Sequence, residues 1–267
     1  MAIKLAAIDL DGTLLRDDMT VSDYTRAVVQ GVAARGIRIV VATGRMFDSA
    51  RAKARLLGLS DMPIICYTGA WAGMSESGTV LWKDGLSLET ARAVLADGKA
   101  RGWVMQSYID DEIYIEKETA LENEVRKYRA KAAKAIGEAF YRPDISPTRL
   151  IIIEPDATKR GKIRDFLEEK YGDDCEMVHP GDMFLDIHKR GVSKANALMH
   201  LSKDWHIAPS EMVSFGNTEN DVSMLSLTGL SYAVGNAELP AKRAAKEVLA
   251  LTNNEDAVAH RLEEMFL

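Results

Sequence analysis

The feature that most constrains this chain is an apolar run near its N-terminus that ends in two acidic residues. The run begins at Ile3, is interrupted only by Lys4, and leads into Asp9-Leu10-Asp11-Gly12-Thr13. Such a pattern predicts a strand that is buried on both faces, as in a parallel sheet covered by helices. Ligands of open parallel sheets bind beyond the carboxyl ends of the strands, so the two acids stand where a site is expected.

Strand and helix patterns alternate after this run. Ser22 can cap a helix that ends near Gly36, and a second apolar run covers residues 37–42. A helix is then expected over 48–57 and a strand over 63–67. This order is typical of the α/β class, with a doubly wound, Rossmann-like parallel sheet.

The middle third of the chain has a different rhythm. A hairpin comes first, and paired strands with intervening helices follow, among them a charged amphipathic helix over 118–134. In the last third the alternation of single strands and helices returns. We therefore expect two domains, a core of residues 1–82 plus 187–267 and an inserted α+β domain of residues 83–186.

Composition excludes several classes of protein. The 267 residues carry 34 Lys and Arg against 40 Asp and Glu, a net charge of −6, so no nucleic-acid partner is expected. No apolar stretch approaches the ~20 residues that span a bilayer, and the N-terminal run is too short for a signal peptide. Two cysteines, Cys66 and Cys175, cannot form a disulfide framework. We expect a cytoplasmic protein with no membrane partner.

Several chemically active segments follow predicted strands, namely 9–13, 43–45 and 217–221. Lys194 lies near a predicted helix start that can face the same crevice. Two acids one residue apart repel each other, which favours a cation beside them, and oxygen ligands suit Mg²⁺. Thr43 is expected to offer a hydroxyl and a free backbone N–H to a phosphate, and Lys194 a positive charge. Together these groups predict phosphoryl transfer.

Each of these side chains also has a purely structural interpretation. Asp-Gly is a common turn dipeptide, so Asp9 and Asp11 can belong to a turn. Thr43 can be a helix N-cap, Lys194 a solvated lysine, and residues 220–221 helix caps. A buried strand that ends in two acids is poorly explained by a turn alone, which favours the functional interpretation.

Four segments resemble the motifs of the haloacid dehalogenase (HAD) superfamily, and their order resembles its Cof-like branch of sugar-phosphate phosphatases. The segments are Asp9-Leu10-Asp11-Gly12-Thr13, Ala42-Thr43-Gly44-Arg45, Gly191-Val192-Ser193-Lys194 and Gly216-Asn217-Thr218-Glu219-Asn220-Asp221. The resemblance covers essentially the whole chain. It implies a HAD core with an inserted cap domain that closes over the site and selects the substrate.

The resemblance implies a role for each residue of these motifs. Asp9 would be the nucleophile and a Mg²⁺ ligand, while Asp11 would act as general acid and base and bind Mg²⁺ through its backbone carbonyl. The phosphoryl group would be held by Leu10, Thr43, Gly44, Lys194 and Asn220. Asp221 would support the metal or orient Lys194. The implied partner is a small phosphorylated metabolite, bound by a monomer or a weak homodimer.

One departure from the family pattern bears directly on activity. Asn217 occupies the position of a metal-binding Asp. An amide oxygen can still coordinate Mg²⁺ but brings no charge, so we expect metal affinity to fall by ~10–100-fold. A smaller departure is Thr68, which stands before Gly69-Ala70 where Asn is usual.

Two functions are compatible with these observations. The first is a Mg²⁺-dependent phosphatase that hydrolyses small phosphate monoesters, with sugar phosphates the expected class, through an aspartyl-phosphate. The second is a catalytically weakened relative that binds a phosphorylated ligand; Asn217 is its only support, whereas the other motif residues are retained. A phosphomutase or a dehalogenase is less well supported, since a dehalogenase has no obvious use for the second acid, Asp11.

Overall fold

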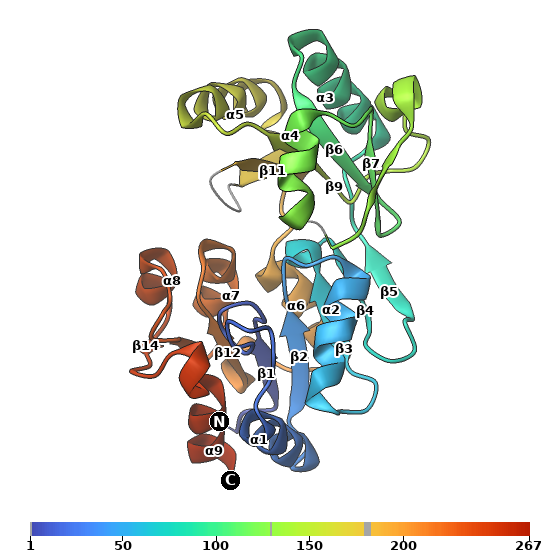
Figure 1. Ribbon diagram of the computed structural model, residues 1–267. Helices are drawn as coiled ribbons and strands as arrows, with labels where there is room; N and C mark the ends of the chain where they lie inside the picture. The colour runs from blue at the N-terminus through green and yellow to red at the C-terminus, as the bar shows by residue number, and fades with distance from the viewer. Residues whose placement is uncertain (1, 129, 179–182) are drawn as a thin grey trace. The chain divides into compact units, whose positions relative to one another are not determined.

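The computed structural model describes residues 2–128, 130–178 and 183–267, and the chain divides into two compact units (Figure 1). The first unit consists of the chain up to Trp82 together with Ser193–Leu267, and the second of Lys83–Val192. The second unit ends at Val192 rather than at the expected 186. The reason is that strand β11 (Phe184–Lys189) pairs within the sheet of the second unit.

The first unit is built on a sheet of eight strands in the order β14-β13-β12-β1-β2-β3-β4-β5. From β14 to β3 all neighbouring strands run parallel, and β4 runs antiparallel to β3. This arrangement confirms the predicted α/β class with a doubly wound parallel sheet. The strands are β1 (Leu5–Ile8), β2 (Arg38–Ala42), β3 (Pro63–Cys66), β4 (Trp71–Met74), β5 (Val80–Lys83), β12 (Met212–Gly216), β13 (Leu230–Ala233) and β14 (Glu247–Val248).

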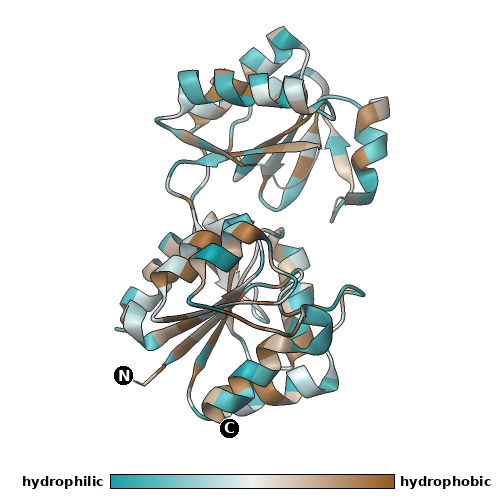
Figure 2. Cartoon of the chain, turned by 90° about the vertical axis from the view of Figure 1, so that its left-hand side faces the viewer, coloured by the Kyte–Doolittle hydropathy of each residue, from teal (hydrophilic) through white to brown (hydrophobic). Residues whose placement is uncertain are grey.

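The central strands are apolar throughout because both of their faces are buried. Every residue of β1 and of β12 is buried, as are the last four residues of β2. Leu5 and Ala7 pack in one core cluster, and the alternate residues Ala6 and Ile8, which point to the other face, are equally inaccessible. Figure 2 shows these strands in brown at the centre of the unit. The run of apolar residues therefore reflects burial of the strand on both faces, as the sequence predicted.

Helices of the first unit begin and end largely where the sequence predicts. The Ser22 hydroxyl accepts a hydrogen bond from the Thr25 N–H at 2.9 Å and caps the first helix, as expected. The helices are α1 (Asp23–Ala34), α2 (Phe47–Ala54), α6 (Lys194–Asp204), α7 (Val222–Leu227), α8 (Leu239–Ala244) and α9 (Ala257–Phe266). In the described part of the chain, no helix combines the length and apolarity needed to cross a bilayer.

The second unit contains a six-stranded sheet in the order β10-β11-β9-β6-β7-β8. Apolar side chains of α3 and α5 pack with those of β6, β9 and β11 into one core. All neighbouring pairs are antiparallel except β7 with β8, in agreement with the predicted α+β domain. Its elements are α3 (Leu88–Arg101), β6 (Val104–Ile109), β7 (Glu112–Ile115), α4 (Ala120–Val125), β8 (Ala133–Ala135), β9 (Arg149–Ile153), α5 (Ala157–Tyr171), β10 (Cys175–Val178) and β11.

The single helix expected over 118–134 is wrong. Helix α4 ends at Val125, a 3₁₀ turn covers Arg126–Tyr128, and Ala133–Ala135 is a strand that pairs with β7. The Ala, Lys and Glu residues of this segment favour a helix locally. Pairing with a neighbouring strand satisfies the backbone of the last part instead, and this partner is set by the tertiary fold.

Candidate active site

The motif segments follow three adjacent strands of the first sheet. β1 lies between β12 and β2 and runs parallel to both. Asp9 directly follows β1, Thr43 follows β2, and Asn217 follows β12. The carboxyl ends of parallel strands meet at one edge of the sheet, so the structure brings these three residues to the same edge.

Lys194 is the first residue of α6, and its side chain is completely buried. Its Nζ lies 2.6 Å from Asp9 Oδ1 and 2.6 Å from Asp221 Oδ1. The backbone just before α6 passes very close to Gly69. A Cβ at Gly69 would lie 2.3 Å from the Ser193 carbonyl oxygen, so the absence of a side chain there makes room for the start of α6. The interpretation of Lys194 as a solvated lysine is therefore wrong.

Asp221 has both carboxylate oxygens engaged. Oδ1 accepts from Lys194, while Oδ2 accepts from the backbone N–H groups of Asn217 at 2.8 Å and Thr218 at 3.1 Å. The side chain is fully buried, and it packs so closely on Gly216 that a Cβ there would lie 2.5 Å from the Asp221 Cβ. Asp221 thus orients Lys194 and holds the turn that carries Asn217.

The buried charges around the site change the proton affinity of Asp9 and of Lys194. Burial raises the pKa of the Asp9 carboxyl to about 7; the Asp221 carboxylate adds to this rise and the Lys194 ammonium opposes it. Burial alone would lower the pKa of Lys194, but the neighbouring Asp221 and Asp9 carboxylates outweigh it and raise that pKa. Lys194 is therefore a cation at neutral pH, and Asp9 needs further positive charge to stay fully ionised.

Asn217 presents an unsatisfied oxygen to this site. The residue is 8% exposed, and its Oδ1 is buried without a hydrogen-bond partner among the described residues. Gly12 makes room for the amide, because a Cβ at that position would lie 2.4 Å from Asn217 Nδ2. Gly12 also has a φ of +70°, a conformation that glycine adopts readily. A buried carbonyl-type oxygen with no partner is a feature that a bound cation or water explains.

The donor set fits Mg²⁺. The Asp9 carboxylate, the Asp11 backbone carbonyl and the Asn217 amide are all oxygen donors, which hard cations such as Mg²⁺ prefer. Within residues 2–128, 130–178 and 183–267, no group of three or more His, Cys, Asp or Glu side chains could hold a metal ion. In this donor set the Asn217 amide would supply an oxygen without a charge, in place of a third acid.

Two expectations for Thr43 are wrong. Its backbone N–H is not free, because it donates to the Ile65 carbonyl at 2.8 Å and continues the pairing of β2 with β3. Thr43 is not a helix N-cap either, since α2 begins at Phe47 after Met46. The hydroxyl is buried and accepts from the Arg45 N–H at 3.2 Å, so its proton remains available to a ligand.

Gly44 and Asn220 come together at the same edge. A Cβ on Gly44 would lie 3.5 Å from Asn220 Nδ2 and 3.4 Å from Thr68 Oγ1. The Asn220 Oδ1 accepts from the Thr218 hydroxyl at 2.9 Å, which fixes the amide. Leu10 is fully buried, and its carbonyl closes the following turn by accepting from the backbone N–H groups of residues 13–15.

Sequence reasoning missed the partner of Asp11. Arg45 Nε donates to Asp11 Oδ2 at 2.7 Å, and Arg45 Nη2 makes a still closer contact with Oδ1. Arg45 belongs to the motif Thr43-Gly44-Arg45, but the sequence assigned it no role. The available signal was that Arg45 follows β2, which lies next to β1, the strand that ends in Asp9 and Asp11.

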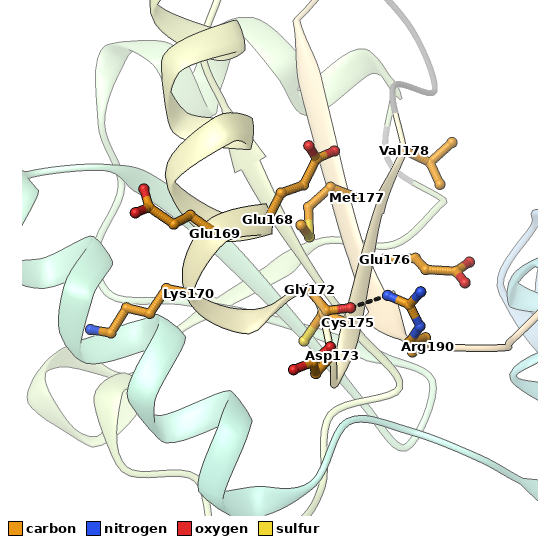
Figure 3. A pocket seen from close by; sticks show the side chains of 10 residues that line it. All are labelled: Glu168, Glu169, Lys170, Gly172, Asp173, Cys175, Glu176, Met177, Val178 and Arg190. Atoms are coloured by element: carbon orange, nitrogen blue, oxygen red, sulfur yellow. Dashed lines mark hydrogen bonds between the residues drawn. The ribbon is translucent and has the colours of Figure 1, made fainter.

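The second unit has a cavity of its own, of about 550 Å³, beside the end of α5 and β10 (Figure 3). Four acids line it, Glu168, Glu169, Asp173 and Glu176, and the Arg190 guanidinium donates to the Gly172 carbonyl. None of the residues predicted for the active site lines this cavity, so it is a separate feature.

Comparison with known proteins identifies a family and several relatives of this chain. The family profile of haloacid dehalogenase-like hydrolases matches residues 6–262. A 5-amino-6-(5-phospho-D-ribitylamino)uracil phosphatase of Escherichia coli is 28% identical over 286 residues, which cover 99% of this chain and 97% of that protein. A phosphatase of the same name from Bacillus subtilis is 23% identical over 266 residues, covering 99% of this chain and 96% of that protein.

Solved structures agree with these matches. A crystal structure of a protein from Thermotoga maritima is 28% identical, with a TM-score of 0.86, and covers 98% of this chain and 97% of that one. A haloacid dehalogenase-like hydrolase from Bacteroides thetaiotaomicron is 25% identical, with a TM-score of 0.85, and covers 99% and 100%. The chain therefore belongs to the haloacid dehalogenase-like hydrolases, in their Cof-like branch, and is a phosphoric monoester hydrolase.

Proposed function

We propose that the protein is a Mg²⁺-dependent phosphatase that hydrolyses small phosphate monoesters through an aspartyl-phosphate on Asp9. The observation that carries this proposal is the buried group of Asp9, Lys194 and Asp221, in which one lysine bridges two acids at 2.6 Å. A lysine held in this way keeps a carboxylate and a positive charge beside the same small volume, which is what phosphoryl transfer needs.

In the first step an Asp9 carboxylate oxygen attacks phosphorus. A new O–P bond forms, the bond from phosphorus to the ester oxygen breaks, and Asp11 donates a proton to the departing alkoxide. In the second step Asp11 takes a proton from water, which attacks the aspartyl-phosphate. Inorganic phosphate leaves, and Asp9 regains its carboxylate.

The remaining site residues would hold the phosphoryl group. Lys194 Nζ supplies a positive charge, and the Thr43 hydroxyl and the Asn220 amide supply hydrogen bonds. The backbone at Leu10 and Gly44 would contribute further contacts. Because Asp221 also accepts from Lys194 Nζ at 2.6 Å, the ammonium would keep a fixed partner when a phosphate binds.

The Asp9 carboxylate, the Asp11 carbonyl and Asn217 Oδ1 would hold the metal ion. Bound Mg²⁺ neutralises charge on the phosphoryl oxygens and on Asp9. The unsatisfied Asn217 oxygen supports this assignment, since it otherwise has no partner in the described structure. The pKa of about 7 for Asp9 supports it further, because a second cation favours the ionised nucleophile.

We infer that the substrate class is phosphorylated sugars and polyols. Two relatives are named as phosphatases of 5-amino-6-(5-phospho-D-ribitylamino)uracil, a compound that carries its phosphate on a ribityl chain. The reacting end of such a molecule is a primary alkyl phosphate, as in many sugar phosphates. Its leaving alcohol is a poor leaving group and needs the acid that Asp11 supplies.

The test is phosphate release from a panel of alkyl phosphates, nucleotides and an aryl phosphate, with Mg²⁺ titrated into the millimolar range. We expect turnover of one or more alkyl phosphates that requires Mg²⁺ and is abolished in Asp9→Asn. Substantial phosphate release by Asp9→Asn would overturn the proposed nucleophile.

Asn217 supports a second candidate function. In it the protein has weakened catalytic activity and binds a phosphorylated ligand. It predicts measurable binding of an alkyl phosphate without turnover, and turnover after Asn217→Asp. Turnover by the unmutated protein excludes it.

A further inference from the structure

Arg45 is placed to control the second acid of the site. It follows β2 by a short turn, and its guanidinium approaches the Asp11 carboxylate with two nitrogens. Nε lies 2.7 Å from Oδ2, and Nη2 contacts Oδ1 more closely. This is the bidentate fork that fixes a carboxylate in one plane and one rotation.

The guanidinium is itself held in place. Nη1 donates to the Ser49 hydroxyl at 3.0 Å, and Nη2 also lies 3.3 Å from Met19 Sδ. The backbone of Arg45 is tied at both ends, since its N–H donates to the Thr43 hydroxyl and its carbonyl accepts from the Tyr67 N–H. The Arg45 guanidinium that contacts Asp11 is therefore held in one position.

Asp11 has little else to orient it. Across the described residues, Arg45 is the only group that hydrogen bonds its carboxylate. The Asp11 side chain is 42% exposed, and that of Arg45 is 23% exposed. Without Arg45 the Asp11 carboxylate would sample several rotamers in contact with water.

We propose that Arg45 is a positioning residue for Asp11. It holds the carboxyl group toward the leaving oxygen and stabilises the carboxylate that remains once the proton has passed to that oxygen. This assignment rests on the proposed phosphatase function. An ion pair as exposed as this one adds little to folding stability, so stability does not explain the fork. Orientation does, because a reacting group displaced by about 1 Å can lose about 100-fold in rate.

The chemistry of the leaving group distinguishes a residue that positions the general acid from one that binds the phosphate directly. An alkyl phosphate releases a strongly basic alkoxide and depends on proton donation, whereas a nitrophenyl phosphate releases a weakly basic phenolate and does not. The ratio kcat/KM reports the steps from free enzyme and substrate to the first transition state that limits the reaction. A residue that acts through Asp11 as the acid should therefore affect kcat/KM for alkyl phosphates selectively.

The experiment compares Arg45→Ala and Arg45→Lys with the unmutated protein on an alkyl phosphate and on nitrophenyl phosphate. We expect kcat/KM for the alkyl phosphate to fall by about 100-fold in Arg45→Ala, with a much smaller loss for nitrophenyl phosphate. Arg45→Lys should lose nearly as much, since lysine keeps the charge but not the fork. In an Asp11→Asn background, Arg45→Ala should have no further effect on the alkyl phosphate.

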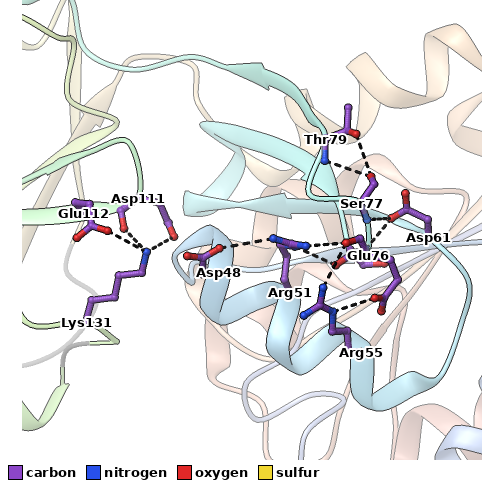
Figure 4. Close-up of polar contacts among 11 residues, drawn as sticks. Asp48, Arg51, Arg55, Asp61, Glu76, Ser77, Thr79, Asp111, Glu112 and Lys131 are labelled. Atoms are coloured by element: carbon purple, nitrogen blue, oxygen red, sulfur yellow. Dashed lines mark hydrogen bonds and ion pairs between the residues drawn. The ribbon is translucent and has the colours of Figure 1, made fainter.

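Arg55→Ala is the matched control. Arg55 follows α2 in the same segment of the chain and also pairs with a carboxylate, Glu76, at 3.1 Å with both side chains about half-exposed (Figure 4). None of its hydrogen bonds reaches a site residue. This variant should retain kcat/KM for both substrates, and the thermal unfolding midpoint should be close to unmutated for all variants.

Three outcomes would overturn the assignment. Equal losses on both substrates would mean that Arg45 binds the phosphate directly. Full activity in Arg45→Lys would mean that charge alone matters. Both results would leave the phosphatase function intact, whereas hydrolysis of neither substrate by the unmutated protein would overturn the function and the assignment together.

Discussion

The Lys194 ammonium lies 2.6 Å from the Asp221 carboxylate, and neither side chain is exposed to solvent. The same ammonium reaches Asp9, so one cation compensates two buried acids. Removing one partner of a buried ion pair leaves an uncompensated charge, which is far more costly than the pair is stabilising. We therefore expect both folding and catalysis to depend on Lys194.

Lys194→Met should lower the free energy of unfolding by ~3–5 kcal/mol at neutral pH and abolish phosphate release. Urea unfolding of the two proteins measures the loss. The double variant Lys194→Met/Asp221→Asn should recover part of the stability but none of the activity. One buried charge is removed, and the amide oxygen can still accept from the N–H groups of Asn217 and Thr218. A single variant as stable as the unmutated protein would contradict the buried pairing.

Asn217→Asp should strengthen the metal site. A carboxylate at this position adds a charged oxygen beside Asp9, so the Mg²⁺ concentration for half-maximal activity should fall by ~10–100-fold. Without Mg²⁺ the variant should unfold at a lower temperature than the unmutated protein, because a third acid repels Asp9 and Asp221. Added Mg²⁺ should reverse that order. An unchanged Mg²⁺ requirement would show that Asn217 lies outside the metal site.

The sequence predicted those features that depend on local patterns. The apolar residues of β1 and the cap at Ser22 are set by neighbours in the chain, and both were identified. The occupied N–H of Thr43 and the complete burial of Lys194 were not, because each depends on a partner distant in the chain. Ile65 accepts from Thr43, and Asp9 lies 185 positions before Lys194.

The same reasoning explains the misassigned helix and the missed arginine. Ala133–Ala135 has a helical composition, yet it becomes a strand because an edge of β7 is available to it. Arg45 carries no local sign of its partner, since Asp11 belongs to a different strand end. The motifs therefore named the candidate residues, whereas the contacts between motifs had to come from the fold.

Asp256 joins the two ends of the first unit. Its carboxylate accepts from the Arg16 guanidinium, the Ser22 hydroxyl and the Thr25 hydroxyl, at 2.6, 2.9 and 3.1 Å. Burial alone would raise the pKa of Asp256, but these hydrogen bonds outweigh it and hold that pKa below its ordinary value of 3.8. The ionised form is thus favoured in the folded state.

Asp256→Asn should therefore destabilise the protein by ~1.5–3 kcal/mol at neutral pH. Asparagine tolerates the positive φ of 57° at this position, so the change tests the charge and not the backbone. A depressed carboxyl pKa contributes stability above the ordinary pKa and loses it as pH falls through the folded-state value. The difference between the two proteins, measured by urea unfolding, should shrink below pH ~4; a difference independent of pH would contradict the assignment.

Cys175 should react slowly with thiol reagents. Burial raises the pKa of its thiol from an ordinary 9.0 to about 12, so the reactive thiolate is scarce at neutral pH. We expect slow labelling of the native protein by a disulfide reagent at pH 8 and fast labelling in urea. A Cys66→Ala variant leaves Cys175 as the sole thiol, and rapid labelling of that variant without urea would contradict its burial.

The raised pKa of the Cys175 thiol also makes the folding stability depend on pH. The unfolded thiol ionises near its ordinary pKa while the folded thiol stays neutral, so its contribution to stability is complete below about pH 9 and is lost as pH rises toward 12. Cys175→Ala should show a flatter decline of stability between pH 8 and pH 10.5 than the unmutated protein. Parallel declines in the two proteins would assign the effect to other groups.

The insertion of Lys83–Val192 into the first unit sets an order of assembly on the ribosome. The second unit is one continuous stretch of chain, so all of its strands are synthesised before Lys194, and domains tend to fold as units during synthesis. β1 is synthesised first, yet its neighbour β12 and the counter-charge for Asp9 come only from the last third of the chain. The earliest strand is therefore among the last to be enclosed, and a nascent chain that stops short of Lys194 leaves Asp9 without the charge that compensates it.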